Sequence, residues 1–249
     1  MSGHSKWSTI KHKKGKLDAQ RGRIFTRLGR ELTISAKEGG GDPDANPRLR
    51  TAVDSARKAN MPADTIKKAI QKGTGELPGV AYEESTYEGY GPGGVAMYIE
   101  VLTDNKNRTV AEIRHLIAKH HGNLGENGSV AWMFHRSGHI TVPQGGVDED
   151  TVMMTALENG ATDVATEDGQ FVVQTEFGDL YAVKEGIEKA GIEISEASVT
   201  MIPQNTIKLE GKPAIQMLKL FEALEEHDDV QNVYANFDID DEIMERFEG

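Results

Sequence analysis

Positive charge is concentrated at the N-terminal end of this 249-residue chain, and this segregation restricts both how the chain folds and what it binds. Up to Lys72 the sequence has seventeen basic and seven acidic residues, a net charge of +10. The rest of the chain has a net charge of −22, although the whole chain carries −12. Such a chain is built to present its basic end to a polyanion, and nucleic acid is the commonest one.

The cations of the opening segment follow a helical spacing. If the chain is helical from about residue 16, five cations lie seven, four, three and seven residues apart and form one stripe. These cations are Lys16, Arg23, Arg27, Arg30 and Lys37. The apolar residues fall on a different side, so the helix can pack in a bundle and hold the stripe toward phosphates. A solvated helix face without a ligand is the alternative interpretation.

The tail before this helix, residues 3–16, is basic and has too few apolar residues for a core of its own. Trp7 either stacks on a base, with neighbouring lysines on phosphates, or docks the tail onto the bundle together with Ile10. Both interpretations stay open. The candidate nucleic-acid-binding residues are Lys6, Trp7, Lys11, His12, Lys13, Lys14, Lys16, Arg21, Arg23, Arg27 and Arg30.

Hydrophobic periodicity and turn signals predict an α+β fold: an N-terminal three-helix bundle and two ferredoxin-like α+β domains, one inserted in the other. The first helix is expected to end at Gly39, the second to begin at Asn46-Pro47 and the third near Pro62. The predicted domains are residues 1–78 (tail and bundle), residues 79–135 with 204–249 (a discontinuous α+β domain) and residues 136–203 (the inserted domain).

The discontinuous domain is predicted from two β-α-β halves. Its strands are expected at 95–102, 129–135, 206–209 and 230–237, with helices from Asn107 to about His121 and from 213 to 227. The inserted domain is predicted as βαββαβ. Relative motion of the two domains is expected.

Two loops bear on binding. The glycine-rich YEGYGPGG, Tyr87–Gly94, precedes a strand and lacks GxxxxGK, so it is interpreted as a structural turn or a partner-contacting loop rather than a nucleotide loop. The polar segment Thr103–Arg108 leads into a helix, where it either holds an anion or caps the helix at Asn107.

Nothing in the sequence indicates catalysis. The absence of cysteine excludes disulfides, thiol chemistry and cysteine-based zinc sites, and fits a reducing cytoplasm. The histidines and carboxylates show no ligand spacing and no acid–base arrangement. We therefore expect no enzyme, metal, cofactor or small-molecule substrate. No apolar run approaches the ~20 residues of a membrane span, so a cytoplasmic protein is expected.

Three long motifs carry a family resemblance: the run from Gly3 to Pro62, the run YEGYGPGGVAMYIEVLTDNKNRTVAEIRH and the run GENGSVAWMFHRSG. They resemble the YebC/PmpR family over essentially the whole chain. Members are described as probable DNA-binding transcriptional regulators, mitochondrial relatives as translational activators of cytochrome oxidase, and some bacterial members as ribosome-associated factors. The resemblance implies nucleic-acid binding.

DNA-binding transcriptional regulation is the expected function. The alternative is a translation factor whose basic end docks on ribosomal RNA. A basic protein is a further expected partner at the acidic domains. A purely protein-binding adaptor would leave the basic stripe unexplained.

Overall fold

In the computed structural model, which describes residues 17–167 and 169–248, the chain divides into two units. Unit 1 contains the residues up to Ala131 and those from Asn205 onward, and unit 2 spans Trp132–Gln204. The predicted insertion, residues 136–203, lies within unit 2. The predicted bundle and most of the predicted discontinuous domain lie together in unit 1, whereas residues 132–135 and 204 belong to unit 2.

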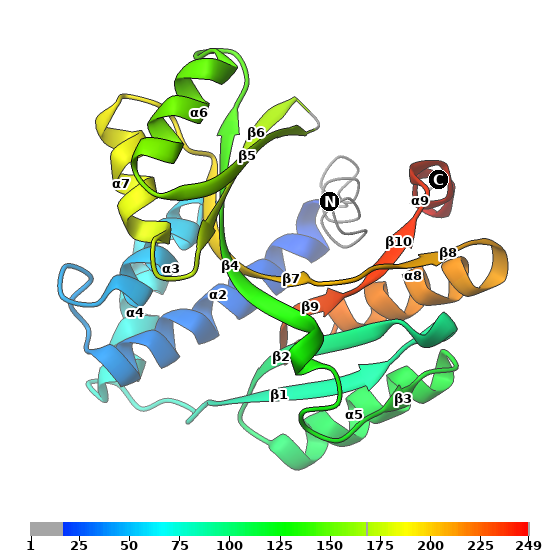
Figure 1. Cartoon of the computed structure of the whole chain (residues 1–249). Coiled ribbons are helices and arrows are strands. Elements are labelled where there is room, and N and C mark those ends of the chain that lie inside the picture. Colours follow the sequence, from blue (N-terminus) through cyan, green and yellow to red (C-terminus); the bar gives the residue numbers. More distant parts are fainter. Residues whose placement is uncertain (1–16, 168, 249) are drawn as a thin grey trace. The chain divides into compact units, whose positions relative to one another are not determined.

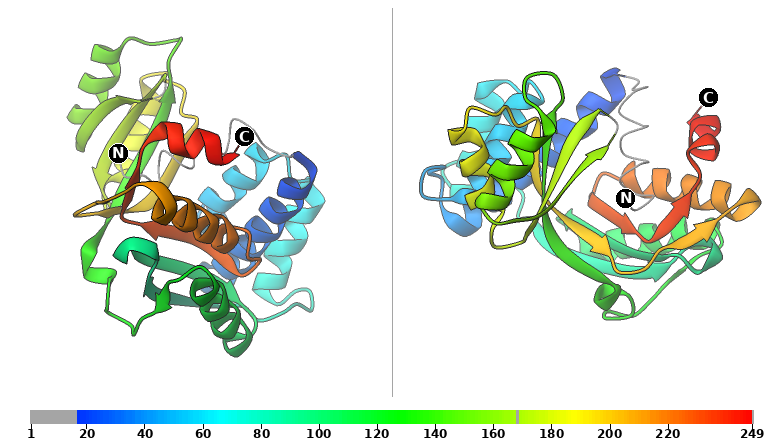
Figure 2. Two further views of the ribbon diagram at one scale, coloured as in Figure 1. Left: turned by 90° about the vertical axis from the view of Figure 1, so that its right-hand side faces the viewer. Right: turned by 45° about the horizontal axis from the view of Figure 1, so that its top comes forward.

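The basic end of unit 1 forms the three helices expected from the sequence, α2 (Leu17–Gly39), α3 (Pro47–Lys58) and α4 (Ala63–Thr74), which lie side by side in Figure 2. Asn46 caps α3: its side-chain oxygen accepts from the amide of Leu49 at 3.1 Å, and its amide nitrogen donates to the carbonyl oxygen of Ser35 at 2.8 Å. This buried side chain thus ties α3 to α2. The bundle core contains Leu32, Leu49, Val53, Ala56 and Ile66.

The rest of unit 1 is an antiparallel sheet covered by two helices (Figure 1). Strands β1 (Glu83–Tyr90), β2 (Ala96–Thr103), β3 (Asn123–Leu124) and β9 (Val230–Ala235) are ordered β3-β1-β2-β9. Helices α5 (Lys106–Lys119) and α8 (Gly211–Glu225) bury Ile113 and Phe221 in one core with Ile99 of β2. The unit also contains the 3₁₀ turn η1 (Pro92–Gly94), the parallel pair β8 (Ile207–Leu209) and β10 (Phe237–Ile239), and α9 (Asp241–Glu248).

Unit 2 has the ferredoxin-like βαββαβ arrangement. Its elements are β4 (Phe134–Pro143), α6 (Glu149–Glu158), β5 (Ala161–Glu167), β6 (Gln170–Glu176), α7 (Leu180–Lys189) and β7 (Glu196–Pro203). The antiparallel sheet has the order β5-β6-β4-β7, and α6 and α7 cover one of its faces (green and yellow in Figure 2). Ile140, Val173 and Val183 lie in the core between helices and sheet.

The mixed helix and sheet class is confirmed, but the predicted strand at 129–135 is wrong. Residues Ala131–Met133 form the 3₁₀ turn η2, and β4 begins at Phe134 and belongs to the sheet of unit 2. The physical reason is the buried carboxylate of Glu88, which accepts hydrogen bonds at 2.7 Å from the backbone amides of Gly128, Val130 and Ala131. Amides bonded in this way are not available to a strand ladder.

Three further details of unit 1 differ from the prediction. Strand β1 was not predicted, because its polar sequence EESTYEGY lacks the apolar alternation of a half-buried strand. The expected strand at 206–209 pairs with β10 instead of joining the four-stranded sheet. The cap of α5 is Asn105, whose side-chain oxygen accepts from the amide of Arg108 at 3.1 Å, and not Asn107.

Candidate nucleic-acid interface

The candidate site residues divide into two groups. Seven lie outside the described residues, and their role stays a prediction: Lys6, Trp7, Lys11, His12, Lys13, Lys14 and Lys16. The other four, Arg21, Arg23, Arg27 and Arg30, lie on α2. Arg21 is exposed, whereas the other three are half-buried.

The three half-buried arginines of α2 contact the turn between α8 and β9 within unit 1. Arg23 pairs with Glu226, Nη1 to Oε1, at 2.5 Å, and Arg27 donates to the carbonyl oxygen of Glu225. Nη1 of Arg30 donates to the carbonyl oxygens of Asp228, at 2.6 Å, and of Leu102, at 3.1 Å. In this conformation the middle of the predicted basic stripe is therefore bonded within the protein. Its contact with nucleic acid stays a prediction.

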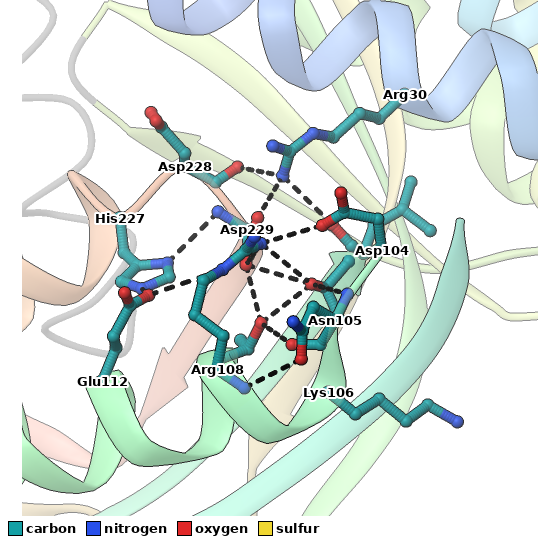
Figure 3. A network of polar contacts seen from close by, with 12 residues as sticks. Arg30, Asp104, Asn105, Lys106, Arg108, Glu112, His227, Asp228 and Asp229 are labelled. Carbon is teal, nitrogen blue, oxygen red and sulfur yellow. Dashed lines mark hydrogen bonds and ion pairs between the residues drawn. The ribbon is translucent and has the colours of Figure 1, made fainter. Parts of the chain in front are cut away.

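A buried carboxylate, Asp229, is the centre of these contacts (Figure 3). Oδ1 accepts from Arg30 at 2.7 Å, and Oδ2 accepts from Arg108 at 2.7 Å. The hydroxyls of Thr109 and Thr103 donate to Oδ2 at 2.6 and 3.0 Å. Burial alone would raise the pKa of Asp229, but these hydrogen bonds outweigh it and hold the pKa well below its usual range. The carboxylate is therefore ionised and compensated by two guanidinium groups.

The side chains of Glu112, His227 and Asp229 each place one ligand atom within 4.8 Å of the others, as a metal site would. Their contacts are already made inside the protein. His227 Nδ1 accepts from the amide of Asp229 at 3.1 Å, so Nε2 carries the proton and donates to Glu112 Oε2 at 3.0 Å. A cation here would have to displace at least one of the two guanidinium groups, Arg30 on Oδ1 or Arg108 on Oδ2, from Asp229. The group is better described as an internal ion-pair network.

The segment Thr103–Arg108, for which an anion site and a capping loop were both open, acts in the structure as a capping loop. Arg108 also bonds Asp104 at 2.9 Å, and Lys106 pairs with Glu83 at 2.8 Å. Both cations that would attract an anion therefore face carboxylates. Sequence reasoning missed this network, because Thr103 and Thr109 lie more than a hundred residues from Asp229 and no local pattern connects them.

The bundle still exposes positive charge on α3 and α4. These residues are Arg50, Arg57, Lys58, Lys67, Lys68 and Lys72. Some have carboxylate neighbours on their own helix: Lys68 pairs with Asp64 at 2.6 Å, and Arg57 lies 3.9 Å from Asp54. Such exposed pairs are weak and exchange readily for another anion.

Among the described residues, no helix is long and apolar enough to cross a membrane.

The fold and the charge distribution together define a class: an α+β protein with a basic helical bundle and a ferredoxin-like insertion. Two family models match this chain, the TACO1/YebC N-terminal domain at residues 5–76 and the TACO1/YebC second and third domain at residues 82–237. The chain belongs to the TACO1/YebC family, which confirms the resemblance.

Similar proteins match along their whole length. A "probable transcriptional regulatory protein" of Pelotomaculum thermopropionicum is 58% identical over 243 residues, which cover 97% of this chain and 100% of the relative. One from Geobacter sulfurreducens is 57% identical over 246 residues, 99% of each chain. The crystal structure of a conserved hypothetical protein, Aq1575 from Aquifex aeolicus, matches with a TM-score of 0.86 and 48% identity, over 94% of this chain and 97% of that one.

Proposed function

We propose that this protein is a regulator of gene expression that binds nucleic acid through its basic end, most directly DNA in transcription. The observation that carries the proposal is the segregation of charge, with +10 up to Lys72 and −22 beyond it. The names of the relatives support the regulatory role. The protein acts in the cytoplasm by binding and not by catalysis.

The contacts of α2 shift the proposed interface toward the tail and the outer helices. Because Arg27 and Arg30 bond unit 1 internally, the phosphate contacts are assigned to the tail lysines, to Arg21 and to the exposed cations of α3 and α4. For duplex DNA, the four residues 59–62 between α3 and α4 give the connection length of a helix-turn-helix. Lys67 and Lys68 lie in the first half of α4, where such a motif contacts DNA.

A second candidate function is a translation factor that docks on ribosomal RNA. It is favoured by Trp7, a single aromatic residue among lysines and histidines, which suits stacking on an unpaired base. Both candidates use the same basic end, so they differ in the nucleic acid that binds most tightly.

The test is a titration of the full chain with duplex DNA and with a ribosomal RNA fragment over a range of salt. Replacing Lys11, Lys13 and Lys14 by Ala should reduce the slope of log K against log salt by up to about 2.7 on duplex DNA and about 2.1 on single strands. The matched control replaces Lys184, Lys189 and Lys212, in the acidic part of the chain, and should change the slope little.

A wild-type protein that binds neither nucleic acid at low salt would overturn the proposal. Equal losses in the two triple variants would mean that binding depends on net charge and not on the basic end. Tighter binding to the RNA fragment at every salt concentration would select the translation candidate.

A further inference from the structure

A small cavity lies within unit 1 between the second half of α2, the second half of α4 and the segment that leads into β1. Its volume is about 180 Å³. The residues that carry the argument are Thr33, Ile34, Lys37, Lys72, Val80 and Tyr82. Pockets for drug-sized ligands are about 300–1,000 Å³, so this cavity is too small for a complete nucleotide cofactor. It fits one chemical group of a larger ligand.

Two glycines shape this cavity. A Cβ on Gly73 would lie 2.3 Å from the carbonyl oxygen of Thr33, so glycine is required for α4 to approach α2 this closely. A Cβ on Gly79 would lie 3.0 Å from Cβ of Lys72, so glycine lets the chain cross the stem of that lysine. Close packing of α4 on α2 therefore shapes the base of the cavity, whereas its mouth is formed by exposed side chains.

Two ammonium groups from different helices flank the cavity. Lys37 and Lys72 are both exposed, and neither forms an ion pair with another described residue. The one hydrogen bond of Lys37 within this part of the chain is a long contact of 3.5 Å to the carbonyl oxygen of Tyr82. The nearby carboxylate of Glu83 pairs with Lys106 at 2.8 Å. The two lysines are thus available to an outside anion.

The remaining wall is apolar and aromatic. Val80 is 52% exposed and lines the cavity together with Tyr82, which is half-exposed. The guanidinium of Arg30 lies 5.4 Å from the centre of the Tyr82 ring, a cation–π contact that favours this position of the ring. Two cations beside an ordered aromatic ring match the phosphate and the base of one nucleotide unit.

We propose that this cavity takes the base of one unpaired nucleotide of a single-stranded nucleic acid, against Tyr82 and Val80, while the phosphate of that nucleotide lies at the mouth between the exposed ammonium groups of Lys37 and Lys72. A base inside a duplex is stacked and paired, so it cannot enter a cavity of this size. The inference rests on the proposed function and specifies it further: the basic bundle recognises a single-stranded segment, such as an RNA loop or an opened duplex.

The test compares a single strand of twelve nucleotides with the duplex of the same sequence, using the full chain. The double variant Lys37→Ala/Lys72→Ala is matched by Lys58→Ala/Lys67→Ala, which removes the same charge from the bundle outside the cavity. The cavity variant should reduce the salt slope on the single strand by about 0.7, because the two lysines hold one phosphate. It should also lose single-strand affinity more than the control does, whereas the control, which removes Lys67 of the proposed duplex interface, should lose duplex affinity at least as much as the cavity variant.

A second variant examines the aromatic wall. Tyr82→Leu keeps apolar bulk but removes the ring, and it should weaken single-strand binding about five- to hundredfold with little effect on the duplex. Circular dichroism melting identifies any variant that has lost its fold, and Tyr82→Phe, which keeps the ring, should bind as wild type does.

The outcomes separate this inference from the proposed function. If wild type binds but the cavity and control variants behave alike on both ligands, the nucleotide site is wrong and the proposed function stands. If wild type binds no nucleic acid at low salt, both fail. If a polyglutamate peptide displaces the single strand as well as a polyuridine strand of equal charge does, the cavity is a general anion site and the proposal is overturned.

Discussion

The arginines of α2 and the two lysines beside the cavity belong to the same helical bundle and are equal in charge, but the protein uses them differently. Arg27 and Arg30 bond carbonyl and carboxylate oxygens at the end of α8 and in the turn that follows it, whereas Lys37 and Lys72 form no ion pair with another described residue. A guanidinium is planar, weakly hydrated and carries five donors, so it serves several buried acceptors at once. An ammonium is strongly hydrated and stays at the surface.

The same distinction holds at Arg48 on α3, which bonds Glu31 of α2 at 2.7 Å and also contacts Glu84 of β1. Burial alone would lower the pKa of Arg48, but the bonds to Glu31 and Glu84 outweigh it and raise the pKa. Arginine therefore joins the bundle to the sheet of unit 1, and part of the positive charge counted in the sequence is structural. A count of cations overestimates how many are free for phosphates.

The largest expected effect comes from removing the carboxylate that holds the arginines. Asp229→Ala should reduce the free energy of unfolding by about 3–5 kcal/mol, because it leaves Arg30 and Arg108 without their buried partner. The control is Glu226→Ala, whose pair with Arg23 is exposed and should contribute about 0–1 kcal/mol. Urea unfolding measures both. Equal losses would show that burial does not distinguish these two pairs.

Acid should remove the contribution of the Asp229 carboxylate to the stability of the folded protein. Its pKa is lowered in the folded protein, whereas an unfolded Asp has a pKa of about 3.9. The stabilisation is therefore fully present above about pH 5 and declines as the pH falls below about 4, where the unfolded chain binds a proton that the folded chain does not. Urea unfolding at pH 7, 5 and 3.5 should be measured for wild type and Asp229→Ala. The difference in free energy of unfolding between the two proteins should be equal at pH 7 and 5 and smaller at pH 3.5. A difference that grows in acid would contradict the ionised assignment.

These contacts also show what the sequence could predict. The bundle was predictable because Asn46-Pro47 is a local cap signal and the apolar residues of each helix repeat with helical spacing. Strand β1 was hidden by its polar sequence. The Asp229 network joins Arg30, Thr109 and a residue near the C-terminal end, and such long-range pairing leaves no local trace. Whether a given arginine is free depends on that pairing, so the stripe alone could not identify the interface.

The smallest expected effects come from single substitutions of Arg21 and Arg23. These two residues allow the most direct comparison, because they are two residues apart on α2 and differ in their partners. Arg21 is exposed and forms no ion pair with another described residue, whereas Arg23 pairs with Glu226. Arg21→Ala should reduce the salt slope of duplex binding by up to about 0.9, and Arg23→Ala by less.

Glu226→Ala should release Arg23 and steepen the slope by up to about 0.9. That steepening should disappear in the double variant Arg23→Ala/Glu226→Ala, because it arises from the freed guanidinium and not from the lost negative charge. If the double variant keeps the steeper slope, repulsion by Glu226 is the cause, and the pairing of Arg23 does not limit binding.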